Sequence, residues 1–270
     1  MVVQHNLSAM NTNRQLGIVT DSMSKSTEKL SSGYKINRAA DDAAGLSISE
    51  KMRSQIRGLD KAATNAQDGI SLIQVAEGAL GETHSILQRM NELATQAAND
   101  TNTSTDRAAI RQEMDQLSSE INRIQSTTQF NSMNLLDGSF TGKNLQIGSL
   151  SGQSIKISIG QMNTSQLGIS KLSVSTFAKA GSAMKLIQSA INQVSSQRSA
   201  LGAIQNRLEH TINNLNATSE NTSAAESRIR DTDMASEMVE YSKNNILQQA
   251  GQSMLAQANQ QTQGVVSLLQ

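Results

Sequence analysis

Apolar residues recur at intervals of seven through much of this chain, and this spacing constrains the fold more than any other feature. One row is Leu59, Ala66, Ile73, Leu80, Leu87 and Ala94, and a second is Ile187, Val194, Leu201, Leu208 and Leu215. A seven-residue apolar repeat is typical of helices that pack lengthwise along a narrow seam. The 270 residues include no proline, the main helix breaker, so such helices can continue unbroken. About 40 residues of helix would form a rod about 60 Å long.

Two interruptions divide the helical pattern. The polar tract 99–105 ends the first long helix, and Asp106 opens a shorter one. Between about 131 and 177 the period changes, because Asp137-Gly138 is a turn signal and 155–159 alternates as a half-buried strand does. We therefore predict a mainly α fold, a long antiparallel helical bundle or coiled coil with a small region of one or two β-hairpins.

The two ends of the chain carry weaker rows. The N-terminal row has the same sevenfold spacing, and its members are Val2, Ala9, Leu16, Met23 and Leu30. The C-terminal stripe contains Leu247, Gly251, Met254, Ala258, Val265 and Leu268, with a polar exception at Gln261. Residues 244–270 carry no charge, yet they are too rich in amides and hydroxyls to span a membrane. We predict that the two ends pair and that these rows pack in the core of a larger assembly.

This pairing predicts two sections. Residues 1–44 and 227–270 would form an inner section, with 31–45 as its connecting loop, and 45–226 an outer bundle. Ends this poor in large apolar residues offset little chain entropy alone, so we expect them to be largely disordered until identical neighbours enclose them. A contact that repeats without closing into a ring gives a helical filament.

Residue types that carry chemistry are scarce. The chain has no cysteine and three isolated histidines, so the usual zinc and thiolate sites are not predicted. Asp41-Asp42 is a better candidate for a helix cap or a partner of Arg38 than for a catalytic dyad. The net charge is zero, which does not favour nucleic acid or an anionic membrane as a partner. We expect no enzyme activity and no cofactor. The N-terminus does not resemble a cleaved secretory signal, so any export is expected to use another route.

Three stretches make the chain recognisable. SSGYKINRAADDAAGLSISEKM, NAQDGISLIQVAEGAL and ILQQAGQSMLAQANQ closely resemble bacterial flagellin, over roughly 1–135 and 180–270. The resemblance implies a homopolymer, the helical filament of the extracellular bacterial flagellum, used for motility. It further implies export in an unfolded state, a chaperone on the C-terminal helix, and assembly at the tip with filament cap and hook-junction proteins. The short interval between the two halves implies a minimal subunit without a separate surface domain.

A further stretch, LQRMNELATQAAND, resembles the helix that the flagellin-sensing Toll-like receptor of vertebrates grips. The resemblance implies receptor contacts at Arg89, Leu93 and Glu113, and innate immune recognition. The same residues are also expected to serve contacts between neighbouring subunits, which is the preferred explanation of their presence.

Two other classes of protein remain open from the sequence. A hook–filament junction adaptor would resemble flagellin at both ends but occur in few copies. A secreted helical effector that binds host membranes should carry a strongly apolar helix pair, which this sequence lacks.

Overall fold

The computed structural model describes residues 6–267, and their side chains up to Gln261. Five helices are present in this range: α1 (Leu7–Ser32), α2 (Ala43–Ala97), α3 (Ser104–Thr127), α4 (Phe177–Arg230) and α5 (Met234–Ser267). The four strands are β1 (Gln129–Phe130), β2 (Met133–Asn134), β3 (Lys143–Gln146) and β4 (Ser154–Ile157). The predicted mainly α fold, with long helices packed together and small antiparallel strand pairs, is confirmed.

The chain forms two compact units, and each is described by itself. One contains 1–54 and 221–270, and the other contains 55–220. These divisions fall inside α2 and α4, whereas the sequence analysis placed them at the helix ends near 44 and 227. The inner and outer sections therefore stay a prediction about assembly.

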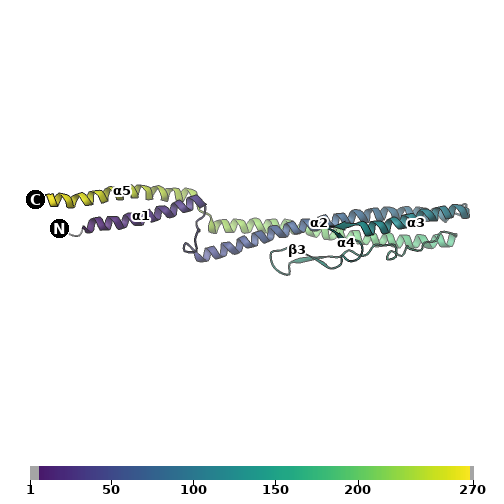
Figure 1. Ribbon diagram of the computed structural model, residues 1–270. Coiled ribbons are helices and arrows are strands. Elements are labelled where there is room, and N and C mark those ends of the chain that lie inside the picture. Colours follow the sequence, from purple (N-terminus) through teal and green to yellow (C-terminus); the bar gives the residue numbers. More distant parts are fainter. Residues whose placement is uncertain (1–5, 268–270) are drawn as a thin grey trace. The chain divides into compact units, whose positions relative to one another are not determined.

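The seven-residue rows form the core of the 55–220 unit. From Ala66 to Ala94 every member of the first row is completely buried, and so are the members of the second row from Ile187 to Leu208. Ile110, Met114 and Ile121 of α3 join the same cluster. Figure 1 shows α2, α3 and α4 running alongside one another in this unit. Burial of one continuous apolar stripe on each helix accounts for helices this long.

Two strand pairs cover part of this helical core. β1 pairs with β2 and β3 with β4, both antiparallel, with Leu145 opposite Ile155 in the second pair. Ile155 and Ile157 of β4 are buried while Ser154 and Lys156 are exposed, as the alternating pattern predicts. Gly69 of α2 lets β3 approach, because a Cβ at this position would lie 2.4 Å from Leu145 Cδ2.

Local capping sets the helix ends. Thr103 and Asp106 form a reciprocal capping box at the start of α3. Asp42 accepts a hydrogen bond from the Gly45 backbone N–H at the start of α2, as expected for a cap. Gly33 ends α1 in the left-handed region, with φ of 76°. None of these ends requires a distant residue.

In the unit that contains both ends of the chain, α1 lies antiparallel along α5 (Figure 1). Lys29 pairs with Glu237 at 3.5 Å near one end of the pair. Asn6 Nδ2 donates to the Ala258 carbonyl at 2.9 Å near the other end. The connecting segments are joined by backbone hydrogen bonds, from Lys35 N–H to the Arg230 carbonyl and from Thr232 N–H to the Gly33 carbonyl.

Candidate assembly surface

The face of α1 that meets α5 follows the predicted N-terminal row. Ala9, Leu16, Met23 and Leu30 are half-buried, and Thr12, Val19 and Ser26 fill the positions between them. Val2, also predicted in this row, lies outside the described residues. Because this face mixes apolar with hydroxyl side chains, it stabilises the helix pair only modestly.

The face of α5 that meets α1 differs from the predicted stripe. Ala258 is buried there as predicted, but Leu247 and Met254 are 46% and 58% exposed and do not face α1. The buried and half-buried residues of this part of α5 are Tyr241, Asn244, Asn245, Gln248, Gly251, Leu255 and Ala258, so the seam shares Gly251 and Ala258 with the predicted stripe. Leu247 and Met254 follow Asn244 and Gly251 by three residues, which places them about 60° away around the helix. Val265 belongs to α5 but its side chain is not described, and Leu268 lies outside the described residues.

Asn244 is a polar residue buried in this seam. Its side chain is 4% exposed, and its Nδ2 has no hydrogen-bond partner among the described residues. A polar residue in a helix seam lowers stability but restricts the register that the helices adopt. About two helical turns further along α5, Gly251 allows α1 to approach closely, because a Cβ at this position would lie 3.2 Å from Leu16 Cδ1.

Large apolar side chains remain exposed on both helices of the pair. We call them the exposed apolar set: Leu7, Met10, Ile18, Met234, Met238, Val239, Ile246, Leu247 and Met254. Val239 and Ile246 are seven residues apart, and so are Leu247 and Met254, so α5 carries two further rows that do not face α1. Exposed apolar rows of this kind mark surfaces that other chains cover.

Charge is missing from the same region. After Lys243 the chain carries no charged residue to its end. The ionic groups of α5 lie in its first turns, where Asp233 accepts hydrogen bonds from the Ala235 and Ser236 backbone N–H groups. These bonds, that of Ser236 foremost, hold the pKa of the Asp233 carboxyl below its ordinary value. The rest of α5 is suited to neighbours that bring no charge of their own.

The residues assigned to receptor contact separate into two groups. Arg89 Nε and Nη2 both donate to Glu113 Oε1 at 3.0 Å, and Nη1 donates to Glu92 at 3.2 Å. The hydrogen bond to Glu113 is the main cause that raises the pKa of Arg89. Both partners are exposed, whereas Leu93 is only 2% exposed and packs in the core. The prediction of an accessible contact therefore fits Arg89 and Glu113 but not Leu93, because α2 turns that side chain towards its neighbouring helices.

Metal sites, membrane-spanning helices and the Asp41-Asp42 pair are the other candidate functional features of the described residues. Residues 6–261 contain no cluster of three or more His, Asp or Glu side chains placed to hold a metal ion. None of the helices of the described range is long and apolar enough to cross a bilayer. Asp41 accepts hydrogen bonds from the Arg38 and Asn37 backbone N–H groups, which lower the pKa of its carboxyl and give it a structural role.

Fold and surface together define a class: a helical structural protein with apolar rows left open for other chains. Comparison with known proteins is more specific. The bacterial flagellin N-terminal helical region matches residues 3–141, and the bacterial flagellin C-terminal helical region matches residues 184–269.

Whole-chain relatives agree with these matches. A flagellin of Halalkalibacterium halodurans is 55% identical and one of Bacillus subtilis is 51% identical, each over the full length of both chains. The crystal structure of Bacillus cereus flagellin shares 32% identity with a TM-score of 0.52, and the match covers 60% of this chain and 94% of that one. The chain belongs to the bacterial flagellin family, in a minimal form, and is a structural subunit of a flagellar filament rather than an enzyme.

Proposed function

We propose that the α1–α5 pair is the polymerising element of this subunit, and that copies of the same pair cover the exposed apolar set. In this proposal the inner section of the filament is built from residues 1–44 and 227–270, and 45–226 forms the outer part. The observation that carries it is the exposure of large apolar side chains on both helices while the seam between them is partly polar.

The free energy gained by burying the exposed apolar set can offset the cost of association. Complete burial of a Val, Leu, Ile or Met side chain contributes about 1.5–3 kcal/mol. Several such side chains on each subunit therefore supply enough to offset the loss of rotational and translational freedom on association, about 4–15 kcal/mol. The absence of charge beyond Lys243 removes a competing cost, because a repeated helix would place each charge near its own copies.

The finer steps of assembly are part of the same proposal. The subunit is exported unfolded and added at the tip of the extracellular filament, in contact with cap and hook-junction proteins. Two features support export in this state: the chain has no cysteine that could form a disulfide, and the α1–α5 seam is only partly apolar. An export chaperone would cover the open rows of α5 beforehand. A chain truncated after Lys243 is expected to lose capture of this chaperone from a motile bacterium, and retained capture would contradict the assignment.

The decisive experiment introduces charge into the exposed apolar set. Ile246 of α5 and Leu150 of the β3–β4 connection are both 66% exposed, so replacement of either by lysine should leave the free subunit folded. We expect Ile246→Lys to abolish filaments in electron micrographs of the purified, polymerised protein, and the matched Leu150→Lys to keep them. Filaments of normal length from Ile246→Lys would refute the role given to α5.

Receptor recognition is a separate part of the proposal. Arg89 and Glu113 form an exposed ion pair between α2 and α3, and this pair would meet the flagellin-sensing Toll-like receptor of vertebrate hosts. Alanine at either position is expected to weaken receptor signalling by soluble subunits. The pair formed by Glu120 and Arg123, also exposed and on α3, provides a control. Equal effects from both pairs would show that the contact is not at Arg89.

A further inference from the structure

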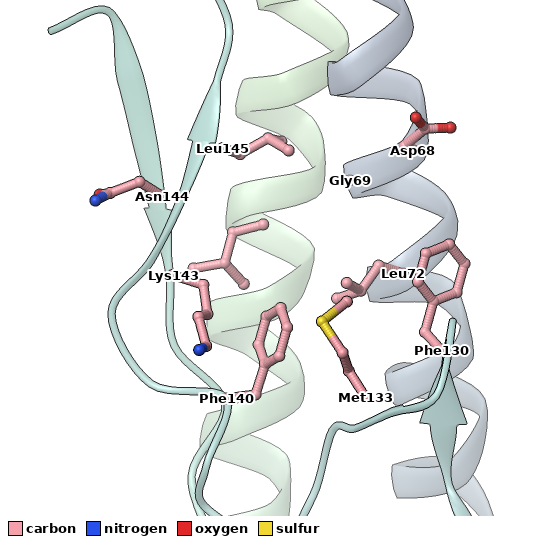
Figure 2. A pocket seen from close by; sticks show the side chains of 10 residues that line it. Asp68, Gly69, Leu72, Phe130, Met133, Phe140, Lys143, Asn144 and Leu145 are labelled. Carbon is pink, nitrogen blue, oxygen red and sulfur yellow. The ribbon is translucent and has the colours of Figure 1, made fainter.

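An apolar groove opens on the side of the 55–220 unit, and nothing within the described chain fills it. Its volume is about 310 Å³. Figure 2 shows Phe130 and Met133 on one side and Phe140 and Lys143 on the other, with Leu72 of α2 between them. Asp68 stands on α2 at one edge. Two of the three phenylalanines of the chain thus line one groove.

The turn between two of the strands that line the groove has unusual backbone angles. The turn between β1 and β2 places Asn131 and Ser132 at φ of 47° and 62°, a region that side chains other than glycine rarely adopt. This turn positions Phe130 and Met133, and Met133 is 43% exposed. Strained residues persist where the surrounding structure uses the geometry they impose. The turn thereby fixes where Phe130 and Met133 stand at the groove.

The third phenylalanine of the chain is exposed on the same unit. Phe177 is the first residue of α4 and is 63% exposed. Aromatic side chains contribute strongly when buried and are enriched at interfaces. An exposed phenylalanine and an unfilled groove lined by phenylalanine are complementary in size and polarity.

Within one chain the two cannot meet. A Cβ at Gly69, beside the groove, would lie 3.4 Å from Leu208 Cδ1, so the groove is level with Leu208 of α4. The step from Phe177 to Leu208 along α4 is 208 − 177 = 31 residues, which at 1.5 Å per residue is about 47 Å. Only a second copy, displaced by about that length along the helix axis, brings its Phe177 to this groove.

We propose that Phe177 of one subunit inserts into the groove formed by Phe130, Met133 and Phe140 of the next. The contact joins two different surfaces and repeats without closing, which is the type of contact that builds an open filament. Charge is consistent with it: Asp68 at the groove and Lys179 beside Phe177 form no ion pair within residues 6–261. This inference rests on the filament function and assigns it a specific axial contact.

Cross-linking tests the contact directly, because the chain has no cysteine of its own. Full-length Met133→Cys/Ala178→Cys, which keeps Phe177, is polymerised and treated with a short bismaleimide. We expect a ladder of covalent oligomers from filaments and none from dilute monomer. The matched double variant Met133→Cys/Leu150→Cys also has an exposed second position and should give no ladder. Filaments without a ladder, or equal ladders from both variants, would overturn the contact.

A second measurement does not depend on cross-linking geometry. Phe177→Ala should raise the protein concentration needed for polymerisation roughly tenfold, since a buried aromatic group is lost from each contact. Leu150→Ala is the control and should leave that concentration unchanged. An unchanged value for Phe177→Ala would overturn the proposal. If the unaltered chain formed no filaments, the proposed function would fail instead, so the two failures are distinct.

Discussion

Replacement of Gly78 by alanine should stabilise the 55–220 unit. Gly78 lies in the interior of α2, on its exposed face, and a Cβ built there meets no atom within 4 Å. Glycine in a helix interior is less favourable than alanine by about 1 kcal/mol, mainly because the unfolded chain loses more freedom. With no new contact to oppose it, the full gain should appear. For a unit of this size it corresponds to a rise in Tm of about 2–4 °C.

Gly69, on the same helix, is the matched control. Gly69→Ala gains the same helix propensity, but its Cβ would lie 2.4 Å from Leu145 Cδ2 and 3.4 Å from Leu208 Cδ1. Overpacking of this kind costs about 1–3 kcal/mol, which cancels or exceeds the gain. Thermal unfolding of both full-length variants, followed by circular dichroism below the polymerisation concentration, separates the two cases. A Tm for Gly78→Ala at or below that of the unaltered chain would refute the reasoning, as would an equal rise for Gly69→Ala.

Three further perturbations test other parts of the structure. Ile121→Ala removes a completely buried side chain of α3 and should lower the free energy of unfolding by about 3 kcal/mol, measured by urea denaturation. Arg230→Lys loses the stacking of the guanidinium 4.5 Å from the Tyr34 ring centroid and should cost about 1 kcal/mol in the same assay, whereas Arg53→Lys, in an exposed pair, should cost nothing measurable. The folded-state pKa of Asp233 is lowered, so its capping contribution is present above the ordinary carboxyl pKa and is lost as the pH falls through the lowered value. Asp233→Ala should therefore be less helical than the unaltered chain at neutral pH and equal to it in strong acid, and a difference that persists in acid would contradict this origin.

Much of the fold was predictable because it depends on local pattern. The two seven-residue rows identify the faces of α2 and α4 that become the core, and the alternation around Ile155 identifies β4. Helix ends were less accurate: the predicted loop 31–45 ends earlier, because Asp42 caps a helix that already begins at Ala43. The β1–β2 turn was not predicted, because Asn131-Ser132 lacks the glycine that usually signals such a turn.

The terminal helices mark the limit of sequence reasoning. The sequence by itself determined that α1 and α5 are helices and that each has few large apolar residues in its seven-residue row. It also determined that α5 carries no charge towards its C-terminal end. It did not determine which side of α5 faces α1, because apolar residues occur on several sides and the periodicity fits each of them equally. Only the tertiary structure placed Asn244 in the contact and left Leu247 and Met254 exposed.

The groove beside Gly69 belongs to the same category. Its walls come from α2 and from both strand pairs, so no residue spacing along the chain predicts it. The sequence establishes periods, which arise from the backbone geometry of each helix or strand alone. Which face is buried, and which apolar groups stay open for another copy, follow from how separate segments pack, and only the tertiary structure decides that.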